Sequence, residues 1–184
     1  ASDILIPGAH NVENYMAAIA ATQQLASKED VEYVATHFGG VEHRIEFVRE
    51  LDGVKYYNDS IASSPSRSKA GLRSFAQKVI LIAGGYDKNL DYAEFGEEVK
   101  AHVKTLVLVG ATSDKIEQAC LAAGMEKENI VRCTEFAQAV YAARDAAQNG
   151  DVVLLSPASA SFDLFKNFME RGKVFKDIVN GLGE

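Results

Sequence analysis

The composition of this chain fits a globular protein and excludes several classes of function. It has 184 residues, 47% hydrophobic and 24% charged, with a formal net charge of -7. That length suffices for one domain and part of another. Nucleic acid is not an expected partner, because the chain has no run of Lys or Arg. No apolar stretch approaches the ~20 residues that span a bilayer, and the start lacks the pattern of a signal peptide, so we expect a cytoplasmic protein with no membrane contact.

The amino-terminal segment predicts the end of a strand followed by two helices. Residues 4–8 are strand-like but have nothing before them to pair with, which suggests a piece of a longer protein. Apolar residues within 11–26 fall mostly on one helical face, and Asn11 can cap that helix. A second helix is expected over residues 29–35, with Ser27 as its cap and an end before Gly39-Gly40, the best hinge candidate.

The rest of the chain predicts an α/β fold: a Rossmann-like, doubly wound, mostly parallel sheet with an antiparallel hairpin at its start. Two β-rich runs, residues 44–51 and 54–58, flank Asp52-Gly53, a strong two-residue turn signal. Several later strands are continuous Val, Leu and Ile runs, as in parallel strands covered on both faces. The expected strands are residues 79–83, 106–109, 130–132 and 152–155, and the expected helices are residues 66–75, 92–102, 114–123, 136–147 and 162–182, the last with Gly172 as a candidate break.

The two cysteines do not indicate a metal or redox site. Cys120 falls in a helical pattern and Cys133 just after a strand, without C-x-x-C spacing and with too few partners for zinc. We expect reduced, buried thiols and no metal site.

Three loops follow strands at the edge of the sheet where ligands bind in open α/β folds. They comprise residues 84–89, 110–113 and 156–161. Glycines allow close backbone approach, Lys88 supplies a point charge, and the helix expected after Ser161 offers its amide-rich amino end to a carboxylate or phosphate. The sequence therefore predicts an anion site between the first and last of these loops, whereas residues 110–113 fit an ordinary turn.

Other polar residues lie where a site is expected but also fit structural roles. Asp59 and Ser63 come directly after the strand over 54–58, where they serve equally well as a turn former and a helix cap. Asn11 and Asn14 start the first helix and Arg44 follows the hinge. Asn amides suit the edge of a nucleobase and Arg suits a phosphate, although each of these residues alone is more often structural.

The aromatic series near the end and the missing motifs limit what the chain can do. The simplest interpretation of the series is a helix face buried against the sheet, formed by Phe162, Phe165, Phe168 and Phe175. No G-x-x-x-x-G-K-[ST] phosphate loop, no G-x-G-x-x-G and no nucleophile with supporting partners occurs. The catalytic machinery is therefore incomplete in these residues.

Four segments together closely resemble the carboxyl-terminal part of the D-glutamate-adding ligases of the Mur family. They are Gly8-Ala9-His10-Asn11-Val12-Glu13-Asn14, His43-Arg44, Asn58-Asp59-Ser60-Ile61-Ala62-Ser63 and the run over 156–172. The resemblance covers nearly the whole chain. It implies that residues 1–40 are the end of a central ATPase domain and residues 41–184 a carboxyl-terminal, amino-acid-binding domain. The family's phosphate loop, magnesium ligands and carbamylated lysine lie upstream, so the chain alone is not expected to catalyse.

The resemblance also implies a reaction in peptidoglycan synthesis. In the family, ATP phosphorylates the carboxylate of UDP-N-acetylmuramoyl-L-alanine, and the amine of D-glutamate attacks the acyl phosphate to give the amide, ADP and phosphate. Positioning and domain closure contribute much of such catalysis. The implied cofactors are ATP and Mg²⁺, and the implied ligands are D-glutamate, UDP-N-acetylmuramoyl-L-alanine and ATP. We expect a monomer, with no cofactor bound tightly to these residues alone.

By motif position, the resemblance assigns residues to two ligands. The D-glutamate contacts are Ser63, Lys88, Ser161, Phe162 and Phe168, and the ATP contacts are Asn11, Asn14, Arg44 and Asp59. The chain departs from the family at Ile61, where many members carry Lys, and at Ser159, where Cys is common. A positive contact near the ATP or the substrate is therefore absent or supplied elsewhere.

Two other interpretations stay open at this point. One is a nucleotide- or anion-binding α/β module without activity, which a reading frame beginning near Ala1 would favour. The other is a different ATP-dependent amide ligase, such as a folylpolyglutamate synthetase, against which the run over 156–172 argues.

Overall fold

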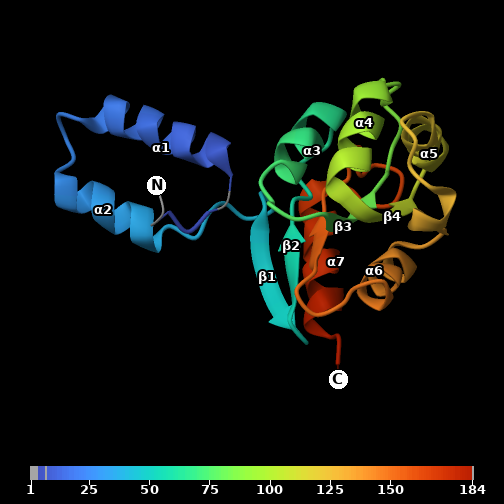
Figure 1. Ribbon diagram of the computed structural model, residues 1–184. Coiled ribbons are helices and arrows are strands. Elements are labelled where there is room, and N and C mark those ends of the chain that lie inside the picture. The colour runs from blue at the N-terminus through green and yellow to red at the C-terminus, as the bar shows by residue number, and fades with distance from the viewer. Residues whose placement is uncertain (1–3, 7, 184) are drawn as a thin grey trace.

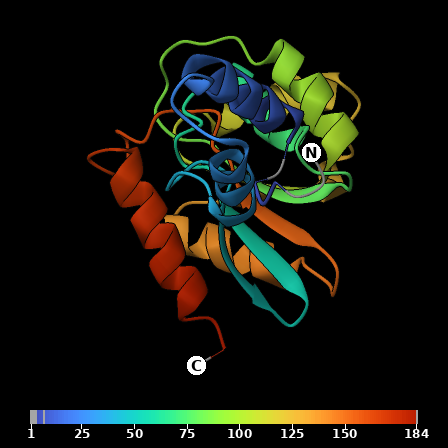
Figure 2. The same ribbon diagram turned by 90° about the vertical axis from the view of Figure 1, so that its left-hand side faces the viewer.

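A computed structural model shows two helices followed by an α/β domain (Figure 1). The structure describes residues 4–6 and 8–183. Helices α1 (Ala9–Thr22) and α2 (Lys28–His37) lie outside the sheet, beside its β1 edge in Figure 1 and in front of the sheet domain in Figure 2, which is seen from their side. No helix in the described part of the chain is long and apolar enough to cross a bilayer.

The ends of the first two helices agree only in part with the sequence. Ser27 caps α2 through a capping box, in which the Asp30 N–H donates to Ser27 Oγ at 3.2 Å and the Ser27 N–H donates to Asp30 Oδ2 at 2.9 Å. Asn11 is not the cap of α1, because that helix begins two residues earlier, after Gly8. Residues 4–6 form no strand, since none of the strands in the described sheet pairs with them, and Pro7 lies outside the described residues.

The sheet has six strands in the order β1-β2-β6-β3-β4-β5. Its first pair is the predicted antiparallel hairpin, and its turn residues Asp52 and Gly53 both have positive φ (52° and 75°), as a tight hairpin turn requires. The other pairings are parallel, which confirms the predicted fold class. The strands are β1 (Glu46–Leu51), β2 (Val54–Asn58), β3 (Val79–Ala83), β4 (Val103–Val109), β5 (Ile130–Cys133) and β6 (Val152–Leu155).

Helices cover both faces of this sheet. Side chains alternate along β3, so Val79 and Leu81 face one buried cluster while Ile80 and Ile82 face the other. Helices α3 (Pro65–Leu72), α4 (Ala93–His102) and α5 (Ser113–Ala122) contribute to the first cluster, and helices α6 (Phe136–Asp145) and α7 (Phe168–Asn180) contribute to the second; a short 3₁₀ turn (Lys127–Asn129) precedes β5. This double cover explains why the central strands are apolar throughout.

The last helix differs from its prediction. Helix α7 begins at Phe168, because Asn167 caps it by accepting the Glu170 N–H at 2.9 Å. Phe162 and Phe165 precede the helix, so the prediction that they lie on its face is wrong. Phe162 is 60% exposed, whereas Phe165 is partly buried against the second core cluster and Phe175 is fully buried. The helix runs unbroken through Gly172.

The cysteines are free thiols in different surroundings. Cys120 is buried in α5, and burial raises its pKa to about 12. Cys133 ends β5 and is only half-buried, although burial also raises its pKa. The prediction of buried thiols is therefore right for Cys120 and too strong for Cys133.

Candidate functional site

The loops at the carboxyl edge of the sheet are joined by backbone hydrogen bonds. The Gly84 N–H donates to the Pro157 carbonyl at 2.9 Å, and the Tyr86 N–H donates to the Ala160 carbonyl at 2.8 Å. At Gly85, a Cβ atom would lie 2.2 Å from the Ala160 carbonyl oxygen, so only glycine allows this approach. The loop after β3 and the loop after β6 thus form one surface, as the sequence predicts.

Two of the residues assigned to D-glutamate meet on that surface. The Lys88 ammonium lies 6.0 Å from the centre of the Phe162 ring, at the edge of cation–π range. The ring of Tyr86 packs edge-on against Phe162 with centroids 6.0 Å apart. Lys88 and Phe162 are both exposed, so a charged ligand can reach this corner from solvent. Tyr86 lies in a loop predicted from the sequence to form the site, residues 84–89, but no role was predicted for its ring.

The other three residues assigned to D-glutamate lie elsewhere around the same edge. Ser161 is buried and its carbonyl accepts the Phe165 N–H at 2.8 Å, closing a single turn; the helix starts only at Phe168, so the predicted helix amino end directly after Ser161 is wrong. Phe168 packs edge-on against His43, with centroids 5.8 Å apart. Ser63 is half-buried after β2. Among the described residues, no side-chain contact joins Ser63 or Phe168 to the Lys88 corner.

Arg171 holds these loops together, a role that the sequence analysis missed. Its guanidinium is buried and donates to Ser60 Oγ (3.0 Å), the Ser60 carbonyl (2.8 Å) and the carbonyls of Ser159 and Ala160 (both 3.1 Å). Burial lowers the pKa of Arg171 to about 10, which still leaves it charged at neutral pH. Because its partners, Ser60 on one side and Ser159 and Ala160 on the other, come from loops about a hundred residues apart along the chain, no local pattern reveals this contact.

A cavity of about 330 Å³ lies between the two helices and the start of the sheet domain. It brings together Asn11, Asn14 and Arg44, which the sequence analysis assigned to one ligand. Asn14 Nδ2 donates to Asn11 Oδ1 at 3.3 Å. Most of the remaining lining is apolar, from Ile6, Tyr15, Ala18, Val34, Phe38, Gly40, Val41 and Ile45. An apolar cavity with a few amide groups suits a planar base.

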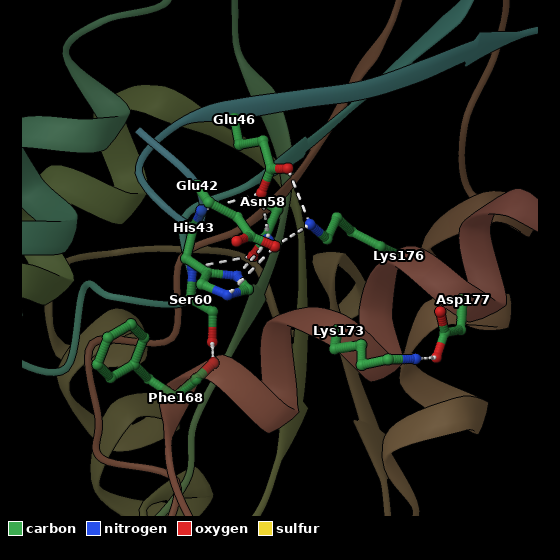
Figure 3. Close-up of polar contacts among 9 residues, drawn as sticks. All are labelled: Glu42, His43, Glu46, Asn58, Ser60, Phe168, Lys173, Lys176 and Asp177. Atoms are coloured by element: carbon green, nitrogen blue, oxygen red, sulfur yellow. Dashed lines mark hydrogen bonds and ion pairs between the residues drawn. The ribbon is translucent and has the colours of Figure 1, made fainter. Parts of the chain in front are cut away.

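The segment that carries Arg44 is held in an unusual backbone conformation. His43 and Ile45, on either side of Arg44, both have positive φ (66° and 46°). The His43 N–H donates to Glu46 Oε2 at 2.9 Å, and Asn58 Nδ2 lies 2.9 Å from both that oxygen and His43 Nδ1 (Figure 3). These contacts fix the backbone on either side of Arg44 and so the direction in which its side chain extends.

An ion-pair network reinforces that segment. The Lys176 ammonium on α7 lies 2.6 Å from Glu42 Oε1 and 2.9 Å from Glu46 Oε1 (Figure 3). Its hydrogen bond lowers the pKa of Glu42. Glu42, His43 and Glu46 have ligand-type atoms within 4.8 Å of one another, but Lys176 already pairs with both carboxylates, so we interpret the group as an ion-pair network.

Asp59 lines a small neighbouring pocket of about 80 Å³, which Arg44 also lines. Asp59 Oδ2 accepts Ser156 Oγ at 2.7 Å, and Oδ1 accepts the Ile45 N–H at 3.3 Å. Burial raises the pKa of Asp59 to about 7, because these hydrogen bonds and the nearby Arg44 and Arg67 charges offset only part of the desolvation. The structure thus brings Asp59 and Arg44 together, and it adds Arg67.

Comparisons with known proteins agree with this fold and show the family. The sequence profile described as "Mur ligase, glutamate ligase domain" matches residues 43–159. UDP-N-acetylmuramoylalanine–D-glutamate ligase of Acetivibrio thermocellus is 56% identical, over 99% of this chain and 40% of that protein. The ligase of the same name from Clostridium novyi is 54% identical, over 98% of this chain. The chain thus spans about 40% of the length of these curated relatives.

Solved structures with low sequence identity share the fold. UDP-N-acetylmuramate–alanine ligase of Thermotoga maritima has a TM-score of 0.71 at 16% identity, over 96% of this chain and 39% of that one. Folylpolyglutamate synthase of Mycobacterium tuberculosis has a TM-score of 0.66 at 13% identity, over 94% of this chain and 41% of that one. The profile match covers more than half of the chain, and the chain belongs to the Mur ligase family.

Proposed function

We propose that this chain is the carboxyl-terminal part of a UDP-N-acetylmuramoylalanine–D-glutamate ligase, an ATP-dependent amide ligase of peptidoglycan synthesis. The observation that carries the proposal is the 56% identity to such a ligase along 99% of the chain. The full-length protein would work in the cytoplasm, as a monomer. These residues would contribute ligand binding and domain closure, and they would be inactive alone because they lack the phosphate loop.

The proposal divides the chain into two parts. Residues 1–40 are the end of the central ATPase domain, and residues 41–184 are the domain that delivers the amino acid. The position of α1 and α2 outside the sheet supports this division (Figure 1). Gly39 and Gly40 precede the segment that enters β1, where a hinge between the two parts would lie.

ATP binds, in this proposal, across the junction of the two parts. Asn11 and Asn14 contact adenine in the larger cavity, and Arg44 reaches the phosphate side when the domains close. Asp59 acts from beside Arg44, because its Oδ1 accepts the Ile45 N–H next to that residue. ATP supplies the phosphoryl group that activates the substrate carboxylate, and Mg²⁺ is held by residues upstream of this chain. The apolar lining and paired amides of the cavity support the adenine assignment.

D-Glutamate binds, in this proposal, at the carboxyl edge of the sheet. Its two carboxylates need cationic and hydroxyl donors, which Lys88, Ser63 and Ser161 supply. Phe162 and Phe168 form the walls of the site. The contact between Lys88 and the Phe162 ring supports a shared site for these two residues.

The experiment is a steady-state assay of ADP release by the full-length protein with UDP-N-acetylmuramoyl-L-alanine and D-glutamate. Replacing Lys88→Ala should raise KM for D-glutamate by a factor equivalent to on the order of 2 kcal/mol, the loss of one charged contact. Arg44→Ala should instead impair the use of ATP. Lys127→Ala, which removes the same charge from the short 3₁₀ turn before β5, is the control and should change neither constant.

The assay has outcomes that count against the proposal. A wild-type protein that releases no ADP in response to D-glutamate would refute the function. ADP release that depends on folate and L-glutamate would indicate a folylpolyglutamate synthase. Unchanged D-glutamate dependence in Lys88→Ala would remove that residue from the site, and a change confined to D-glutamate in Arg44→Ala would refute its assignment.

A further inference from the structure

Two of the seven arginines differ from the others in how their guanidinium groups are bonded. Arg44 and Arg67 make no side-chain hydrogen bond or ion pair with any residue that the structure describes. The other five are all engaged, through carbonyls near the end of α7 (Arg49), Glu98 (Arg73), Asp114 and Glu117 (Arg132), Asp145 (Arg144) and the loop carbonyls and Ser60 (Arg171). Arg44 and Arg67 are both exposed, so an anion in solution can reach their guanidinium groups.

Both unpaired arginines line the same small pocket, which Asp59 also lines. Its volume of about 80 Å³ is several times the roughly 10–15 Å³ that one water molecule needs, which leaves room for a phosphoryl group, and it is about a quarter of the volume of the larger cavity, about 330 Å³. Asp59 is the only acidic side chain in the lining, and the other lining groups are small or apolar: Ile45, Ile61, Ala62, Ala70 and Gly71. Two guanidinium groups over such a pocket favour an anion with several oxygens.

Asp59 does not prevent an anion from binding there. Both of its oxygens accept hydrogen bonds from within the fold, from Ser156 Oγ and the Ile45 N–H. At Gly71 a Cβ atom would lie 2.8 Å from Asp59 Oδ2, so the helix backbone closes over this carboxylate. Burial also raises its pKa to about 7, so close to neutral pH much of it is uncharged.

The small pocket adjoins the larger cavity. Arg44 and Ile45 line both of them. An apolar cavity with amide groups beside a pocket with two arginines matches the two halves of a nucleotide, a planar base and a polyanion. Arg44 lies where the two meet. The positive φ angles of His43 and Ile45 fix the backbone on either side of it.

We propose that Arg67 binds a phosphoryl group of the nucleotide together with Arg44, in the pocket that both side chains line. This inference rests on the proposed function and adds a nucleotide contact to it. Arg67 is a residue of α3, so it belongs to the sheet domain, and it would reach the phosphates only when that domain closes on the ATP. Arg67 would thereby link closure to the presence of the triphosphate.

The test compares ATP and D-glutamate kinetics in variants of the full-length protein. Arg67→Ala should raise KM for ATP about tenfold or more, as expected for a lost hydrogen bond between charged groups, and leave KM for D-glutamate within about twofold. Arg67→Lys should have a KM for ATP between those of the wild type and Arg67→Ala, because an ammonium group cannot form the bidentate contact that a guanidinium group forms. Arg67→Glu should have a higher KM for ATP than either variant, because its carboxylate would repel the phosphoryl group.

The matched control is Arg73→Ala, which removes the same charge just after the end of α3, where Arg73 pairs with Glu98. It should leave KM for ATP unchanged. An active wild-type protein whose KM for ATP is the same in Arg67→Ala and Arg73→Ala would overturn the role of Arg67 and leave the proposed function intact. An effect on D-glutamate alone would overturn it too. A wild-type protein without D-glutamate-dependent ADP release would overturn both proposals.

Discussion

The α1–α2 pair and the sheet domain are stabilised by different interactions. Helix α2 has no buried residue, and Asn11 is the one buried side chain among those described in α1. Leu25, just after α1, is 89% exposed, and Met16 and Tyr33 are also largely exposed. The sheet domain, in contrast, encloses a cluster of apolar side chains on each face of the sheet. Hydrophobic burial therefore stabilises the sheet domain, whereas it contributes little to the helical pair.

Local contacts hold the helical pair instead. The capping box at Ser27 starts α2, and the Tyr15 hydroxyl donates to the Val34 carbonyl at 3.3 Å between the helices. Exposed apolar residues that gather on one part of a protein often mark a contact surface. The contrast therefore supports the proposal that residues 1–40 belong to a neighbouring domain, whose remaining residues would cover these side chains.

The largest expected difference between the two regions concerns apolar truncation. Phe95 is fully buried in α4 against the first core cluster, so Phe95→Ala should lower the free energy of unfolding by about 3–5 kcal/mol. Leu25→Ala should change it by less than about 0.5 kcal/mol. Urea denaturation followed by circular dichroism measures both. Similar losses of unfolding free energy in Phe95→Ala and Leu25→Ala would refute the proposed difference between the two regions.

The next effect is a pH dependence from Asp59. Its pKa is about 7 in the folded protein, well above the ordinary value of 3.8 for an aspartate, so the folded state binds the proton more tightly. The resulting stability is present at low pH and is lost as pH rises through the folded pKa, by about 2–3 kcal/mol between about pH 5 and pH 8. Asp59→Asn should remove this loss. We would measure the difference in unfolding free energy between wild type and variant at each pH; a difference that stays constant would contradict the raised pKa.

A smaller effect is expected where α7 meets the segment that joins the two regions. At Gly172 a Cβ atom would lie 2.3 Å from His43 Nδ1, so Gly172→Ala should cost about 2 kcal/mol by overpacking. Gly181→Ala, just after the same helix, is the control, because its Cβ would meet Asp177 O at an ordinary 3.5 Å. Thermal unfolding compares the two. Equal melting temperatures would show that His43 moves aside without cost.

The smallest effect is local to the helical pair. Ser27→Ala removes the capping box and should destabilise α2 by about 1 kcal/mol. Hydrogen exchange should show faster exchange of α2 amides while those of β3 keep their protection. Ser64→Ala is the control, since Ser64 precedes α3 without a side-chain cap. Loss of protection in both regions would mean that they unfold together.

The sequence predicted well those features that depend on neighbouring residues. Asp52-Gly53 indicated the hairpin turn, Ser27 the cap of α2, and continuous apolar runs the parallel strands, and all three are confirmed. It failed at the start of α7, because the aromatic residues 162 and 165 fit a helical face equally well. The cap at Asn167 decided the boundary instead.

The site shows the same division. The sequence by itself, through motif order and spacing, pointed to the loops after β3 and β6 and to residues on both sides of the larger cavity. Only the tertiary structure showed that Arg171 joins two distant loops by hydrogen bonds and that His43 packs closely against Gly172. It also showed that Arg67 lines the same pocket as Arg44. Turns, caps and strand patterns arise from interactions within a few residues, so they can be recognised in the sequence. These other contacts join residues far apart in the chain, and they exist only once the sheet topology has brought those residues together.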